Sequence, residues 1–236
     1  VAFEYRWRDD AHRKIWDLSF NFGSTLATFM QGIVLGAFVQ GIEVVDRAYG
    51  GGWWDWLTPF TLMCGMALTV GYGLLGSTWL VMKTDGPLRD QAYKLAIRAG
   101  IATLLFIGVA SLWTPFLSPE IAGRWFSFPH FLYVMPVPVA TAVLAGTLFW
   151  GLRRKKDMVP FPAAIGLFAL CFAGLGISIS PYVVPRAITI HEAAAPDSSL
   201  LFMLVGALIL LPLIFAYTAY SYWIFRGKVD PEEGYH

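Results

Sequence analysis

Residues 200–225 read LLFMLVGALILLPLIFAYTAYSYWIF and contain no charged side chain. A helix of about 20 predominantly apolar residues is long enough to cross the hydrocarbon layer of a bilayer. A helix that is apolar on every side has no face to turn toward water. This stretch therefore predicts a helix that spans a membrane.

Five further stretches of the chain share this pattern. We expect them to span the membrane at about 18–42, 57–82, 95–116, 133–152 and 160–184. The composition agrees, because 57% of the 236 residues are hydrophobic and only 14% are charged, whereas soluble domains average about 25% charged residues. The predicted fold class is all-α, a polytopic transmembrane helix bundle of about six spans that forms one integral-membrane domain over residues 1–236.

The Lys and Arg residues alternate between the two sides that these spans define. All but three of the 17 basic residues fall in the first, third, fifth and last polar segments, and the segments between hold only Arg47, Arg124 and Arg186. Cytoplasmic loops of membrane proteins carry the excess of Lys and Arg. We therefore expect both ends of the chain to lie in the cytoplasm. A net charge of +1 argues against a nucleic-acid partner.

Local signals support several of these boundaries. Proline at a first helical position removes a donor that has no partner there, so Thr58 followed by Pro59 predicts a helix start. Gly86 and Pro87 separate the second span from the third. We expect the aromatic segment 117–132 to lie along the membrane interface.

Ionisable groups in the middle of a membrane are costly and usually mark function. No carboxylate or histidine falls in the middle of a predicted span, and the four histidines are His12, His130, His191 and His236. Because membrane haem is usually held by histidine, we expect no catalytic, cofactor-binding or metal-binding residue on this chain.

The first two spans carry small and amide-bearing residues. Gly32 and Gly36 form a GxxxG pair, which allows close helix packing either within the chain or against another subunit. Asn21, Gln31 and Gln40 each need a hydrogen-bond partner in hydrocarbon. We expect bonds between helices, with a quinone or water contact as the alternative.

Glu4 is the acidic residue that we single out. It follows an apolar trio that resembles the end of an earlier span, and the chain begins with Val1, so we expect the N-terminal part of the protein to be missing. A carboxylate at a helix end near the cytoplasm could pass protons inward. Alternatively, Glu4 is a solvated partner of Arg6 or Arg8.

Long ordered stretches of this chain resemble subunit II of the cytochrome bd-type quinol oxidases, nearest to the cyanide-insensitive branch. The stretches are GSTLATFMQGIVLGAFVQG (23–41), DWLTPF (55–60), GYGLLGSTWLVMKTDGPL (71–88), SPYVVP (180–185), AAAPDSS (193–199), AYTAYSYW (216–223) and FRGKV (225–229). The resemblance is weakest from about 117 to 170. Arg186 and His191 depart from the usual pattern of the outer loop.

This resemblance implies a specific role for the chain. Subunit II of the family has about nine spans, which implies that three precede Val1. It also implies a heterodimer in the bacterial inner membrane, in which subunit I binds two haems b and one haem d and oxidises quinol. Subunit II then supports assembly, closure of the haem site and proton delivery. The match of Phe3–Arg6 implies that Glu4 lies at an acidic position of the proton path.

Two other functions stay open from the residues alone. The glycine-rich first two spans are compatible with a secondary transporter, although transporters usually carry an acidic residue in mid-span. The chain is also compatible with a quinol-binding membrane anchor of another respiratory complex, whose partner is a peripheral iron–sulfur subunit.

Overall fold

The computed structural model describes residues 2–46, 48–117, 119–128 and 130–228. Its longer helices are α2 (Arg13–Gln40), α3 (Pro59–Lys83), α4 (Gly86–Leu117), α7 (Pro136–Arg153), α8 (Pro160–Ile179) and α10 (Asp197–Ile224). The short helical segments are α1 (Ala2–Arg8), η1 (Asp10–His12), α5 (Pro119–Phe126), α6 (His130–Val134) and α9 (Ile190–Ala193). Two small antiparallel hairpins join β1 (Val44–Val45) to β2 (Ala48–Tyr49) and β3 (Tyr182–Val184) to β4 (Ile188–Thr189).

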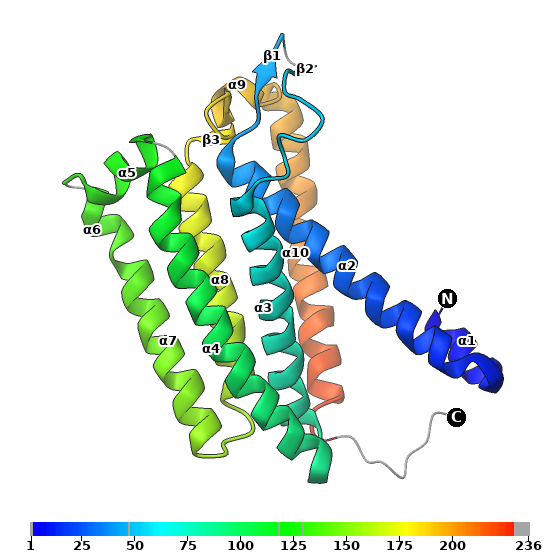
Figure 1. Cartoon of the computed structure of the whole chain (residues 1–236). Helices are drawn as coiled ribbons and strands as arrows, with labels where there is room; N and C mark the ends of the chain where they lie inside the picture. The colour runs from blue at the N-terminus through cyan, green and yellow to red at the C-terminus, as the bar shows by residue number, and fades with distance from the viewer. Residues whose placement is uncertain (1, 47, 118, 129, 229–236) are drawn as a thin grey trace.

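The helical membrane-protein fold predicted from the sequence is confirmed. Within the described residues, α2, α3, α4, α8 and α10 are long and apolar enough to cross a membrane. The remaining predicted span, 133–152, corresponds to α7, which has 18 residues and ends at Arg153. At 1.5 Å per residue it is about 27 Å long, close to the roughly 30 Å of bilayer hydrocarbon. Figure 1 shows α7 running alongside α4 and α8.

Several predicted boundaries were wrong, for local reasons. The helix predicted at 133–152 is interrupted at Met135, between α6 and α7, because Pro136 and Pro138 have no backbone N–H to donate. The span predicted to reach 184 ends at Ile179, ahead of Pro181, which has no backbone N–H to donate. α2 and α4 begin earlier than predicted, because their first turns are polar and lie beyond the apolar run. Segment 117–132 contains two short helices, α5 and part of α6.

The core lies between α3, α4, α7 and α8. Within this core α4 packs mainly against α3 and α8 mainly against α7, and alanines on α4 and α8 leave space for the larger aliphatic side chains of α3 and α7. The buried residues of this core are Leu74, Val81, Ala92, Tyr93, Ala96, Ala99, Leu148, Leu152, Ala163, Ala164 and Leu167. The buried hydroxyl of Thr78 donates a hydrogen bond to the Leu74 carbonyl at 2.8 Å.

The two ends of the bundle differ in composition. Figure 1 shows both hairpins, α5 and α9 at one end, and the α3–α4 and α7–α8 connections with the end of α10 toward the other. The second end therefore collects the basic segments that precede α2, open α4, join α7 to α8 and follow α10. We refer to it as the basic end.

Candidate functional site

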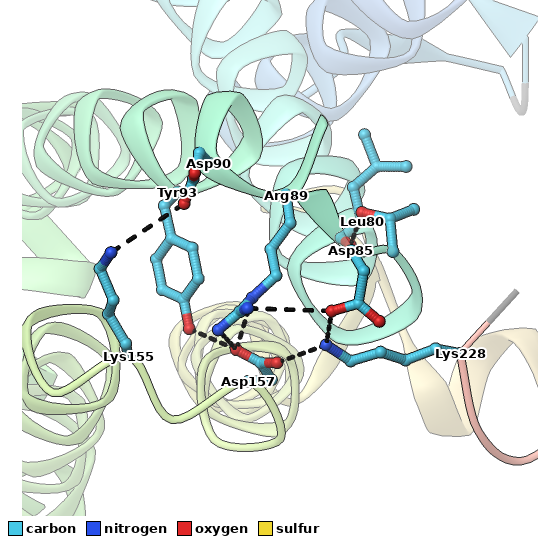
Figure 2. A network of polar contacts seen from close by, with 9 residues as sticks. Leu80, Asp85, Arg89, Asp90, Tyr93, Lys155, Asp157 and Lys228 are labelled. Atoms are coloured by element: carbon cyan, nitrogen blue, oxygen red, sulfur yellow. Dashed lines mark hydrogen bonds and ion pairs between the residues drawn. The ribbon is translucent and has the colours of Figure 1, made fainter. Parts of the chain in front are cut away.

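The basic end holds a cluster of charged and polar side chains from four parts of the chain. It consists of Asp85, Arg89, Tyr93, Asp157 and Lys228, and we call it the charge cluster. Figure 2 shows these side chains converging between the α3–α4 turn, the first turns of α4, the α7–α8 connection and the residues after α10.

Asp157 lies at the centre of this cluster. Its Oδ1 accepts hydrogen bonds from the Tyr93 hydroxyl at 2.7 Å and from Arg89 Nε at 3.1 Å, and Arg89 Nη2 lies 2.9 Å away. Its other oxygen, Oδ2, accepts a hydrogen bond from Lys228 Nζ at 2.7 Å. Only 18% of the Asp157 side chain is exposed. Hydrogen bonds that involve an ionised partner are about twice as strong as neutral ones, so Asp157 ties α4 to the α7–α8 connection and the C-terminal segment.

Asp85 forms the outer part of the cluster. Lys228 Nζ lies 2.5 Å from Asp85 Oδ1, and Arg89 Nη1 lies 3.8 Å from the same oxygen. A second ion pair between Lys155 and Asp90 is longer, at 4.0 Å, and more exposed. The two cations of the cluster thus face two carboxylates, and its charges balance.

The local sequence explains why these groups meet. Gly86 adopts a φ of +63°, which lets the chain reverse from α3 into α4 directly after Asp85. Arg89 and Tyr93 then lie four residues apart on one face of α4. On the opposite connection, Lys155 adopts a φ of +51° just before Asp157 turns back toward α4.

The surroundings of Asp157 and Lys228 shift the pKa values of these two groups in opposite directions. Burial by itself raises the pKa of Asp157, but the hydrogen bonds from Lys228 and Tyr93 and the charge of Arg89 outweigh it and lower that pKa below its usual range. The hydrogen bonds to Asp157 and Asp85 raise the pKa of Lys228. Both groups are therefore held in their charged forms.

These shifts predict how the stability depends on pH. The pKa of Asp157 is lower in the folded state than in the unfolded chain, where it is about 3.9. The ionised carboxylate therefore stabilises the fold above about pH 3.9, and this stabilisation is lost as the pH falls through the folded-state pKa. The pKa of Lys228 is higher in the folded state than in the unfolded chain, where it is about 10.4. The charged ammonium group therefore stabilises the fold below about pH 10.4, and this stabilisation is lost as the pH rises through the folded-state pKa. We expect the difference in melting temperature between the unaltered chain and Asp157→Asn to be constant from about pH 5 to 9 and to shrink below about pH 4. A difference that changes between about pH 6 and 8 would contradict this assignment.

Glu4 lies apart from the charge cluster. It is exposed on α1, which packs beside the start of α2 and away from the other helices (Figure 1). The Arg6 guanidinium pairs with Asp17 of α2, and no hydrogen bond or ion pair joins the Glu4 side chain to another residue in the described part of the chain. The structure thus gives no support to an intramolecular pair between Glu4 and Arg6.

Gly32 and Gly36 lie where α2 crosses α3. A Cβ atom at Gly32 would lie 2.5 Å from the Cys64 carbonyl oxygen and 2.6 Å from Gly65 Cα. At Gly36 it would lie 2.8 Å from Thr61 Cα. The two backbones are therefore in direct contact within this chain, at positions where a side chain has no space.

The amide side chains of α2 have different surroundings. Gln40 Oε1 accepts a hydrogen bond from the Thr58 hydroxyl at 2.7 Å. Thr58 also caps α3 through a capping box with Thr61, as expected for the Thr58–Pro59 start. Asn21 Oδ1 accepts a longer bond from Thr25 at 3.4 Å, whereas Gln31 is exposed.

Sequence reasoning missed the charge cluster as a site. It counted the Lys and Arg residues as a group and did not pair them with acids. Two signals were available: Asp85 precedes Arg89 by four residues, and Asp157 directly follows the basic run 153–156. The contact with Lys228 has no local signal, because it joins residues far apart in the sequence.

The mid-membrane region of the described residues is apolar. Two hollows at helix junctions have volumes of about 670 and 370 Å³. The first is lined by residues of α7 and α8, the second by residues of α2, α3 and α4, and neither lining includes a charged side chain. In the described ranges, no three His, Cys, Asp or Glu side chains are grouped as metal ligands would be. This arrangement suits packing and lipid contact better than a polar substrate.

Comparisons with known proteins decide the family. The sequence model of cytochrome bd terminal oxidase subunit II matches residues 1–225. This chain belongs to that family. It is 25% identical to cytochrome bd-I ubiquinol oxidase subunit 2 of Escherichia coli, with 99% of this chain and 71% of the relative covered. It is also 25% identical to cytochrome bd ubiquinol oxidase subunit 2 of Bacillus subtilis, with 99% and 70% covered.

A solved structure shows the same fold as this member of the subunit II family. The bd oxidase from Geobacillus thermodenitrificans superposes with a TM-score of 0.74 over 95% of this chain and 70% of the solved chain, at 16% sequence identity. The resemblance to cytochrome bd subunit II is thus confirmed. The assignment to the cyanide-insensitive branch stays a prediction.

Proposed function

We propose that this chain is the subunit without haem ligands in a bd-type quinol:oxygen oxidoreductase. In such a complex electrons pass from quinol to O₂, and the protons for water are taken from the cytoplasm. The observation that carries the proposal is the family match over residues 1–225. Membership of this family favours the oxidase over a secondary transporter or the anchor of another complex. The linings of the two hollows also contain no charged side chain that could bind a transported ion.

The haems belong to the partner in this proposal. Two haems b and one haem d are held by subunit I, which also oxidises quinol, and this chain binds none of them. The support is that the long apolar helices contain no histidine, the usual ligand of membrane haem. This chain then contributes packing surface, closure of the haem site and part of a proton path.

The orientation of the chain follows from its charges. The basic end faces the cytoplasm of a bacterial inner membrane, so that both termini of this chain and the charge cluster lie on that side. The support is that the four basic segments gather at one end of the bundle (Figure 1), because positive charge is retained on the cytoplasmic side.

Purification in mild detergent from the native membrane tests the function. We expect a larger membrane subunit to co-purify, with b- and d-type haem absorption and quinol-driven oxygen consumption. A peripheral iron–sulfur partner would identify an anchor of another complex. Substrate transport by the purified chain without any partner would identify a transporter.

Proton delivery gives a prediction at Glu4. If Glu4 carries protons, Glu4→Gln should slow oxygen reduction by the assembled complex about tenfold. The measurement is the initial rate of quinol-driven oxygen uptake per haem d, with Asp197→Asn, a change in the first turn of α10, as control. Equal rates of oxygen uptake for the two variants and the unaltered complex would contradict proton transfer through Glu4 and would show that it is a solvated surface residue.

A further inference from the structure

The connection from α7 to α8 opens with four consecutive basic residues, which we call the basic turn. They are Arg153, Arg154, Lys155 and Lys156. In the described part of the chain, Lys155 lies 4.0 Å from one carboxylate, that of Asp90 (Figure 2), and the side chains of the other three form no ion pair or hydrogen bond. The next acidic residue along the chain, Asp157, is already paired within the charge cluster. The contacts within this chain therefore leave most of the positive charge of the basic turn unbalanced.

Backbone hydrogen bonds complete the end of α7, so the basic side chains are not needed as caps. The Lys156 N–H donates to the Gly151 carbonyl at 2.9 Å, and the Lys155 N–H donates to the Leu152 carbonyl at 3.4 Å. This is the pattern of a Schellman motif, in which Lys155 occupies the left-handed position with a φ of +51°. Glycine is the usual residue there, because a Cβ is unfavourable at positive φ. The local fold therefore does not explain the lysine.

An aromatic side chain indicates the depth of the basic turn in the membrane. Trp150 lies on the last turn of α7, three and four residues before Arg153 and Arg154, and so on the same side of the helix. Tryptophan is enriched where the hydrocarbon meets the headgroups. Since α7 ends at Arg153, the basic turn follows directly beyond this level, at the depth of the lipid phosphates.

Basic residues on α4 continue this surface. Asp90, Lys94 and Arg98 follow one another at four-residue spacing and therefore lie on one side of α4. The contact between Asp90 and Lys155 joins this side of α4 to the basic turn. In the described residues, neither Lys94 nor Arg98 has an ionic partner. The combined surface thus carries six cations and one carboxylate.

We propose that the basic turn binds the headgroups of anionic phospholipids in the cytoplasmic leaflet, with Lys94 and Arg98 at the edge of the same site. Guanidinium groups bind phosphate oxygens in pairs, and ammonium groups bind them as point charges. A zwitterionic lipid brings its own cation, so a lipid with net negative charge, such as phosphatidylglycerol, complements the surface better. The site depends on the orientation proposed above and not on which subunit binds the haems.

Native mass spectrometry of the purified complex, titrated in mild detergent with phosphatidylglycerol or phosphatidylcholine, tests this site. One triple variant changes the basic turn (Arg153→Gln, Arg154→Gln, Lys156→Gln), and a matched control removes three charges from the other basic segments (Arg8→Gln, Lys14→Gln, Arg226→Gln). We expect the unaltered complex to prefer phosphatidylglycerol. The affinity for the first phosphatidylglycerol bound should fall at least about tenfold in the basic-turn variant and less than about twofold in the control.

Three results would overturn the proposal. Equal affinity of the unaltered complex for the two lipids would show that the surface does not select negative charge. Equal losses in the two triple variants would show that binding follows total charge. An unchanged affinity in the basic-turn variant would show that another subunit or protein covers this surface.

Lys155→Gly separates lipid binding from the stability of the fold. Glycine suits the positive φ at this position, so the melting temperature should stay equal or rise. The affinity for phosphatidylglycerol should still fall about threefold, because a charge is lost. An unchanged affinity would contradict a role for Lys155. An excess of inorganic phosphate should leave the lipid bound, and its displacement would identify a site for free anions and overturn the assignment to lipid.

Discussion

Replacing Gly32 with alanine is expected to lower the melting temperature by about 6–12 °C, the equivalent of about 3 kcal/mol. The added methyl group would lie 2.5 Å from the Cys64 carbonyl oxygen and 2.6 Å from Gly65 Cα. Both obstacles are backbone atoms, so neither can rotate away as a side chain would. To remove this steric overlap, α2 and α3 would have to move apart where they cross. They would then lose the van der Waals contact that holds membrane helices together.

The matched control is Gly23→Ala on the same helix. Beyond the backbone of its own helix turn, no atom lies within 4 Å of a Cβ at Gly23, so the change should be neutral or should stabilise the helix by about 0.5–1 kcal/mol through higher helix propensity. Thermal unfolding in detergent, followed by tryptophan fluorescence, measures both variants. Equal melting temperatures for the two would show that the α2–α3 contact contributes nothing to stability.

Charge reversal at the centre of the charge cluster is the second large effect. Asp157→Lys would place a third cation between Arg89 and Lys228 and leave the Tyr93 hydroxyl without its acceptor. Breaking a buried ion pair costs about 3–5 kcal/mol, and the partial exposure of Asp157 reduces this to about 2–4 kcal/mol. We also expect the α7–α8 connection and the residues after α10 to become sensitive to limited proteolysis.

Asp90→Lys is the matched control for this reversal. Asp90 follows Arg89 directly on α4, but 65% of its side chain is exposed and its partner Lys155 is 4.0 Å away. Exposed pairs of this kind contribute about 0–1 kcal/mol, so the melting temperature should change little. If Asp90→Lys destabilised the protein as much as Asp157→Lys, the effect would come from total charge rather than from the cluster.

The helical membrane fold could be predicted because lipid imposes a simple constraint. A chain in hydrocarbon must satisfy its backbone groups internally, so each long apolar run becomes a helix. Helix ends were harder to place. The polar first turns of α2 and α4 continue as helix beyond the apolar run, and the short helices α5 and α6 follow no long apolar run that would fix their ends.

The side-chain contacts between distant segments could not be predicted in the same way. The GxxxG pair indicated close packing, but its partner helix depends on how α2 crosses α3. The bridge from Lys228 to Asp85 and Asp157 forms because the α3–α4 turn, the α7–α8 connection and the segment after α10 meet at one end of the bundle. No local sequence pattern encodes this meeting of distant segments.

Haem analysis of separated subunits tests the central claim most directly. The claim is that the redox groups reside on a companion and that this chain binds none. After the purified complex is dissociated, absorption spectra and haem content per polypeptide should assign both haems b and the haem d to the partner. This chain should then show no Soret absorption. A stoichiometric haem retained by this chain alone would contradict the claim.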